Sequence, residues 1–166
     1  MTTTFTLGDD TLHEALKAVM QAHHEGLHAA GVQVGILIAY NPEGPAVKHH
    51  GTAARATIRV VSLKDRLTKG YDAELLIDQA ELDLMRPDHL AALIDHELSH
   101  LTAVLKRGAF VRDDLGRPRL KLVPGDWDAG DGFREVVARH GDFAPEVDDL
   151  RRAQIIVEAA KADNKQ

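Results

Sequence analysis

The chain has no cysteine among its 166 residues. Disulfide scaffolds and zinc sites built on thiolates are therefore excluded, and any zinc ion must be held by His, Asp or Glu side chains. A long apolar run is missing as well, because no stretch approaches the roughly 20 residues that a membrane span needs. The first residues also lack the basic and apolar segments of a signal peptide. Together with the lack of cysteine, which fits a reducing compartment, these absences predict a cytoplasmic protein without a membrane partner.

An excess of positive charge is missing too, since the formal net charge is −6. A negative balance argues against a general nucleic-acid binder. The apolar fraction of 44% and the charged fraction of 28% are ordinary for a globular protein. The length fits one domain over residues 1–166, in which we expect residues 1–8 and 163–166 to be frayed.

The feature that organises the chain is an H-E-x-x-H pattern from His96 to His100. Two histidines four positions apart lie on one face of a helix, one turn above the other. This separation lets two imidazole nitrogens reach one zinc ion at about 2.0–2.1 Å. Glu97 would lie beside the metal, next to a water whose pKa zinc lowers to about 7. The pattern predicts His96 and His100 as zinc ligands and Glu97 as the catalytic base.

The surrounding residues predict that this pattern lies in the middle of a helix. Apolar residues recur at spacings of three and four, namely Leu90, Leu93, Ile94, Leu98, Leu101, Val104 and Leu105. Pro87 and Asp88 suit the first turn, and Gly108 is a plausible stop. Asp95 is expected to face solvent or a neighbouring strand. The competing interpretation is a half-buried helix with solvated histidines, because ten histidines make a chance match easier.

Other segments predict an α+β arrangement. Helical patterns cover residues 11–30, 133–139 and 146–162, and strand patterns cover residues 32–40, 53–62 and 73–78. Residues 63–70 are interpreted as a loop, and residues 109–112 and 119–123 as a hairpin. His24 and His28 are also four apart in the first helix, although exposed helix histidines explain that pair better than a second metal site.

Basic residues gather in two parts of the sequence. They are Lys48, Arg55, Arg59, Lys64, Arg66 and Lys69, and then Lys106, Arg107, Arg112, Arg117, Arg119 and Lys121. A weak nucleic-acid contact through basic strands is one interpretation. A solvated strand face is favoured, because no aromatic platform is interleaved with these charges.

A catalytic zinc ion needs a third protein ligand, which the spacing of the sequence does not fix. The candidates downstream of the helix are Asp126, Asp128, Asp131 and His140. An aspartate in this loop is at least as well suited to capping the helix that starts near Phe133.

Several segments resemble the putative phage metallopeptidase family, which is itself similar to SprT-like zinc peptidases. They are the strand ending in Ile77-Asp78, Ala92 to Leu101, Asp113 to Leu122 and Phe133 to Gly141. A histidine before the last of these helices looks like the family's third ligand. Counting back from Phe133 places Asp128 at that position, followed in rank by Asp126 and Asp131. His140 then matches an element that would act behind the ligands or as a transition-state donor.

The resemblance implies a zincin-like fold, with a small mixed sheet packed on a central active-site helix that carries the H-E-x-x-H pattern. It implies a bacterial or phage-infected host cell and zinc-dependent hydrolysis of peptide bonds. Zinc would be held by His96, His100 and Asp128, and Glu97 would activate water. An edge strand, for which we expect residues 73–78, would bind an extended peptide or protein substrate. The alternative is a non-catalytic zincin-like binding module that contacts protein or DNA.

Overall fold

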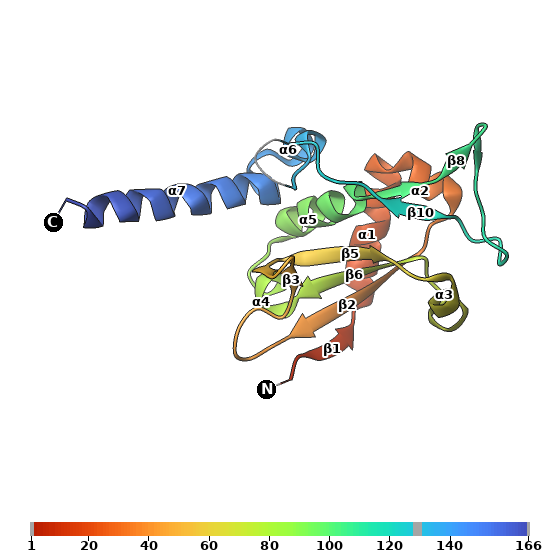
Figure 1. Ribbon diagram of the computed structural model, residues 1–166, viewed down its shortest axis with the longest axis horizontal. Helices are drawn as coiled ribbons and strands as arrows, with labels where there is room; N and C mark the ends of the chain where they lie inside the picture. The colour runs from red at the N-terminus through yellow and green to blue at the C-terminus, as the bar shows by residue number, and fades with distance from the viewer. Residues whose placement is uncertain (1, 128–130, 166) are drawn as a thin grey trace.

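The structure is a computed structural model that describes residues 2–127 and 131–165. It has a mixed α+β fold in which helices lie against a small mixed sheet (Figure 1). The sheet order is β1-β2-β6-β5, with only the β2–β6 pair parallel. Its strands are β1 (Thr4–Leu7), β2 (Val34–Tyr40), β6 (Ala73–Asp78) and β5 (Ala56–Val60). The predicted α+β class with a small mixed sheet is confirmed.

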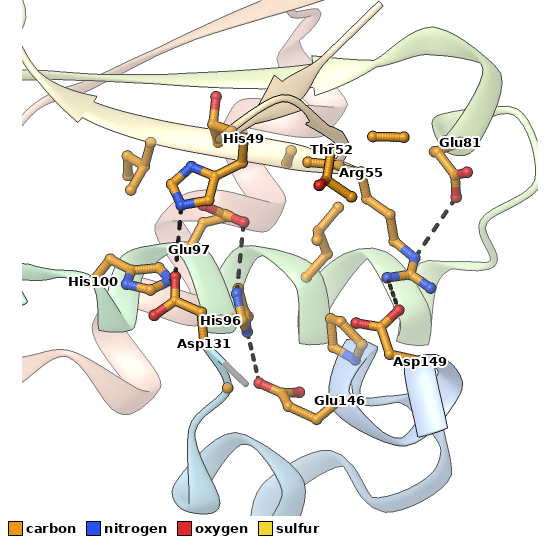
Figure 2. A pocket seen from close by; sticks show the side chains of 18 of the residues that line it. His49, Thr52, Arg55, Glu81, His96, Glu97, His100, Asp131, Glu146 and Asp149 are labelled. Atoms are coloured by element: carbon orange, nitrogen blue, oxygen red, sulfur yellow. Dashed lines mark hydrogen bonds and ion pairs between the residues drawn. The ribbon is translucent and has the colours of Figure 1, made fainter. Parts of the chain in front are cut away.

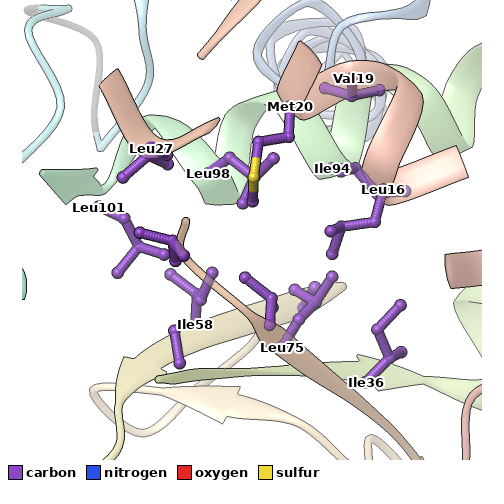
Figure 3. Close-up of a cluster of buried hydrophobic side chains, with 14 of the residues drawn as sticks. Leu16, Val19, Met20, Leu27, Ile36, Ile58, Leu75, Ile94, Leu98 and Leu101 are labelled. Atoms are coloured by element: carbon purple, nitrogen blue, oxygen red, sulfur yellow. The ribbon is translucent and has the colours of Figure 1, made fainter. Parts of the chain in front are cut away.

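The core lies between the sheet and the helices α1 (Asp10–His23) and α5 (Pro87–Ser99). Figure 3 shows side chains from these elements meeting in one apolar layer. It includes Leu16, Val19 and Met20 from α1, Ile94 and Leu98 from α5, and Ile36, Ile58 and Leu75 from the sheet. Each fully buried aliphatic side chain stabilises the fold by about 1.5–3 kcal/mol. This layer therefore fixes α5, and the residues on it, against the sheet.

Helix α5 ends earlier than its apolar pattern predicts. Pro87 begins it as expected, but Ser99 is its last residue and His100 is its C-cap. Leu101–Ala103 forms strand β7 instead, and the His100 carbonyl accepts a hydrogen bond from Val123 at 2.8 Å. Strand pairing therefore replaces the expected last turns of the helix. His100 keeps helical dihedrals (φ −73°, ψ −16°), so it still lies one turn after His96.

The segment after α5 is a hairpin that starts earlier than predicted. Strand β7 pairs with β10 (Leu120–Leu122), and β8 (Leu105–Lys106) pairs with β9 (Ala109–Phe110). Of the expected pairing of residues 109–112 with 119–123, the hydrogen bond from the Arg119 amide to the Val111 carbonyl at 2.8 Å is present, and an isolated bridge joins Arg112 to Pro118 beside it.

Two helical predictions also change. The expected helix over residues 11–30 breaks at His24, which separates α1 from α2 (Glu25–Ala30). Residues 63–70, interpreted as a loop, contain helix α3 (Leu63–Lys69). Ser62 caps α3 by accepting a hydrogen bond from the Asp65 amide, and Gly70 ends it at φ +73°.

The remaining elements surround α5. The short hairpin β3 (Lys48–His49) and β4 (Thr52–Ala53) precedes β5, and α4 (Gln79–Leu82) follows β6. The chain ends with α6 (Arg134–His140), the 3₁₀ turn η1 (Gly141–Phe143) and α7 (Pro145–Asp163). Helix α7 extends away from the body of the molecule (Figure 1). No helix within residues 2–127 and 131–165 is long and apolar enough to cross a membrane.

Candidate functional site

A cleft of about 800 Å³ runs along α5, opposite strand β5 and the β3–β4 hairpin. His96, Glu97 and His100 line it from the side of α5 (Figure 2). Residues of the loop before α6 and of the start of α7 close it, namely Trp127, Asp131, Gly132, Pro145 and Glu146. The structure therefore brings all three residues of the sequence motif to one concave surface.

Each of the two motif histidines is held in place by a hydrogen bond from its Nδ1 atom. The Nδ1 of His96 lies 2.6 Å from an oxygen of Glu146, and the Nδ1 of His100 lies 2.8 Å from the carbonyl oxygen of Val123. Because both partners are acceptors, each Nδ1 carries the hydrogen and each Nε2 keeps a free lone pair. Phe133 packs edge-on against both rings, with ring centroids 5.5 and 4.7 Å away. The rings are therefore fixed in the tautomer that a metal ligand needs.

Glu97 is almost buried, with 5% of its surface exposed, yet it faces the cleft. Its carboxylate oxygen lies 3.8 Å from the Nε2 of His96, and it accepts a hydrogen bond from the backbone of Ile58 in β5. Burial raises the pKa of Glu97 to about 7; the nearby His96 opposes this rise and Asp131 adds to it. A carboxylate with a pKa near neutrality has the property expected of a general base.

The two histidines differ in their affinity for protons. Burial opposes a charge on His96, but its hydrogen bond to Glu146 and the nearby Glu97 outweigh burial and raise the pKa of His96. Burial lowers the pKa of His100. The difference follows from the partners, because a carboxylate stabilises an imidazolium more than the carbonyl of Val123 does.

The aspartates predicted as third ligand have different positions. Asp126 caps α6, accepting a hydrogen bond from the Arg134 amide at 2.9 Å, which is the capping role weighed against metal binding. Asp128 lies outside the described residues. Asp131 accepts from the Gly125 amide with one oxygen, and its other oxygen lies 3.5 Å from the Nε2 of His100. Among the described candidates, Asp131 is the one that meets a motif histidine.

Glu146 is a site residue that sequence reasoning missed. One of its oxygens accepts from both the His96 ring and the Phe133 amide, so it joins α5, α6 and α7. A Cβ on Gly132 would lie only 2.5 Å from its Cγ, so the loop can approach this closely only with glycine. Nothing in the local sequence marks Glu146, because it follows its partners His96 and Phe133 at no recognisable spacing. Its second oxygen is buried and has no hydrogen-bond partner among the described residues.

His49 is a second residue that sequence reasoning did not place in the site. It extends from the tip of the β3–β4 hairpin across the cleft, above His100 and Asp131 (Figure 2). Its Nε2 lies 3.9 Å from the same oxygen of Asp131 that faces His100. Half of its side chain is exposed.

A second cluster of histidines and a carboxylate lies on another side of α5. Asp95 is fully buried, contrary to the expectation that it faces solvent or a strand. Its oxygens lie 2.7 Å from His24, 2.8 Å from His140 and 2.9 Å from Arg139. Burial opposes the charge of Asp95, but these hydrogen bonds outweigh it and hold the pKa of Asp95 well below its ordinary value.

This Asp95 cluster also offers donor atoms to a metal, because those of His23, Asp95 and His140 lie within 4.8 Å of one another. Its chemistry favours a structural role. The carboxylate is already saturated by two imidazoles, and the Arg139 guanidinium places a positive charge where an ion would sit. His140 is thereby bound to Asp95 and is not among the residues that line the cleft. The favoured interpretation of His24 and His28 as exposed helix histidines holds for His28 and is wrong for His24, because the His24 side chain is 10% exposed and binds Asp95.

The donor set in the cleft fits a zinc ion better. Two imidazoles whose Nδ1 atoms are hydrogen-bonded present their Nε2 atoms from one face of α5, and Asp131 adds a carboxylate oxygen. The unpartnered oxygen of Glu146 adds negative charge behind His96. Nitrogen and oxygen donors of this kind are typical ligands of catalytic zinc.

Many of the basic residues that suggested a nucleic-acid contact are neutralised by carboxylates. Each of the following forms an ion pair: Arg55, Arg59, Arg66, Lys69 and Arg117. Paired cations release few counterions on binding a phosphate backbone. These contacts do not support nucleic-acid binding.

One of three comparisons with known proteins found a match. Searches of curated proteins and of solved structures gave no match. A family model described as "Putative phage metallopeptidase" matches residues 6–159, which is nearly the whole chain. The match includes α5, the loop before α6 and Glu146. The chain therefore belongs to the putative phage metallopeptidase family.

Proposed function

We propose that the protein is a zinc-dependent peptidase whose metal is held by His96, His100 and an aspartate of the loop before α6. Asp131 is the best-supported ligand among the described residues, because its free oxygen faces His100 at 3.5 Å. Asp128 stays the candidate implied by the family resemblance. The single observation that carries the proposal is the matched support of the two motif histidines, which leaves both Nε2 atoms free at the cleft.

The reaction would be hydrolysis of a peptide bond. When bound, zinc lowers the pKa of water to about 7 and polarises a carbonyl group. Glu97 accepts a proton from the attacking water as the water oxygen bonds to the carbonyl carbon. Glu97 then gives this proton to the leaving nitrogen as the carbon–nitrogen bond breaks. Its buried position and its hydrogen bond from Ile58 hold the carboxylate in place for both transfers.

Strand β5, and not β6, is the strand we propose for substrate binding. The expectation for residues 73–78 is wrong, because β6 lies between β2 and β5 and has no free edge. Strand β5 is at the edge of the sheet, and residues 54–58 line the cleft beside Glu97. An extended peptide can add to such an edge through main-chain hydrogen bonds.

The test is the Glu97→Gln variant, measured on unfolded casein with zinc and again with a chelator. Loss of the base should lower the rate by about 10²–10⁴-fold and leave zinc affinity unchanged. Glu14→Gln is the control, since Glu14 is exposed on α1. Zinc-dependent cleavage at the wild-type rate by Glu97→Gln would contradict the proposed base.

The second candidate is a non-catalytic module that contacts a protein. Helix α7 favours it, because this helix exposes Leu150, Ile155, Ile156 and Val157 away from the body of the fold. Equilibrium dialysis at neutral pH separates the two functions. Absence of bound zinc together with absence of cleavage would favour the module.

A further inference from the structure

The β3–β4 hairpin holds His49 rigidly at its tip. Its two-residue loop consists of His50 and Gly51, with φ of +49° and +81°. Positive φ at both central residues is the condition for a type I′ turn, which matches the twist of paired strands. The ladder pairs His49 with Thr52, directly beside this turn. The backbone of His49 is therefore fixed by a tight hairpin.

The base of the hairpin is fixed as well. The buried carboxylate of Asp78, at the end of β6, accepts hydrogen bonds from the amides of Ala46 and Val47 at 2.7 and 3.2 Å. The Val47 side chain is 1% exposed, and its carbonyl accepts from the Ala54 amide. The hairpin is thus tied to the central sheet and forms a firm wall of the cleft opposite α5.

This wall points the His49 imidazole at the reacting centre. The Nε2 atoms of His49 and His100 lie 3.9 and 3.5 Å from the same oxygen of Asp131. His49 comes from the wall opposite α5 (Figure 2), and both His49 and Glu97 line the cleft beside β5 in which a peptide would bind. A donor at this place is within the same cleft as the proposed base and can contact a carbonyl group bound there.

We propose that His49 is a catalytic residue that donates a hydrogen bond from its ring to the scissile carbonyl oxygen as that oxygen gains negative charge. This inference rests on the proposed function. His49 gains and loses no proton overall, so the hydrolysis remains balanced by Glu97 alone. A fixed donor of this kind stabilises the transition state more than the bound substrate, and therefore acts on kcat. Its half-exposed ring on the wall opposite α5 suits contact with substrate better than service as a buried zinc ligand.

The experiment compares wild type, His49→Gln and His50→Asn as full chains. The substrate is an internally quenched peptide that carries a site cleaved in unfolded casein. His50→Asn is the matched control, because Asn-Gly also satisfies the type I′ turn. It removes a ring that packs edge-on against His49, with centroids 4.1 Å apart, and leaves the His49 imidazole in place. Zinc affinity, by chelator competition, and the absorption spectrum of the Co²⁺ form give readouts independent of turnover.

His49→Gln should lower kcat by about 10²–10³-fold, with KM within about threefold of wild type. Its zinc affinity and its Co²⁺ spectrum should equal those of wild type, and His50→Asn should retain activity within about twofold. An unchanged kcat in His49→Gln would overturn the proposal. So would a tenfold loss of zinc affinity or an altered Co²⁺ spectrum, which would make His49 a ligand. A wild type no faster than Glu97→Gln would instead overturn the peptidase function itself, and this inference with it.

Discussion

Helix α5 contributes to two clusters of histidine and carboxylate side chains. The clusters differ in which ligand atoms are left without a hydrogen bond. At the cleft, His96 and His100 use Nδ1 for support and keep Nε2 open. Outside the cleft, the Nε2 atoms of His24 and His140 contact the carboxylate of Asp95, which Arg139 also binds. The first cluster borders a cleft of about 800 Å³, whereas the second surrounds a fully buried carboxylate.

The comparison teaches that proximity of histidines and a carboxylate does not make a metal site. A metal ion needs ligand atoms whose lone pairs are not taken by hydrogen bonds, and a site whose net charge is not already balanced by another cation. The Asp95 cluster fails on both counts, because its carboxylate is saturated and Arg139 already supplies the positive charge. We therefore propose that the Asp95 cluster stabilises the fold and that the cleft binds the metal ion.

The largest effect on stability is expected at Asp95. Asp95→Asn leaves Arg139 and two histidines without their anion, so the free energy of unfolding should fall by about 3 kcal/mol. Urea denaturation with a chelator measures this loss, and zinc affinity should change by less than about threefold if the comparison holds. Asp142→Asn is the control, because Asp142 is 78% exposed and pairs only at the surface with Arg151.

The same variant should also show a defined pH dependence. The pKa of Asp95 is depressed in the folded chain, so its stabilising effect is full above the unfolded value of about 3.9 and declines as the pH falls below it. The difference in unfolding free energy between wild type and Asp95→Asn should therefore shrink from pH 5 towards pH 2. A difference that stays constant over this range would contradict an ionised, hydrogen-bonded Asp95.

A smaller effect is expected at Glu146, on metal affinity. Glu146→Gln removes the negative charge behind His96 and should weaken zinc binding by about 10–100-fold, the usual range for a partner of a ligating histidine. Chelator competition measures the affinity. Glu158→Gln serves as control, since Glu158 is exposed on the same helix. Equal zinc affinities for the two variants would show that Glu146 does not support zinc binding.

The sequence predicted the parts of the site that follow from local geometry. Spacing alone placed His96, Glu97 and His100 on one side of a helix, and Pro87 marked where that helix begins. It placed the helix end too late, because Leu101 continues the apolar pattern while its backbone pairs with β10. Periodicity reports which side chains are buried and does not report which backbone groups find a strand partner.

The residues that complete the site are far apart in the sequence, and only folding brings them together. His49 depends on the anchoring of its hairpin by Asp78, and Glu146 on the approach of α7 to α5. Asp95 looked solvent-facing because its partners come from α6 and from the break between α1 and α2. No spacing rule connects such positions, so these contacts required the fold.

The most direct test is a zinc competition titration of wild type, His100→Ala and His140→Gln. The cleft assignment predicts one zinc ion per wild-type chain, a loss of affinity on the order of a thousandfold in His100→Ala, and wild-type affinity in His140→Gln. Weakened binding in His140→Gln with normal binding in His100→Ala would place the metal in the Asp95 cluster and contradict the account.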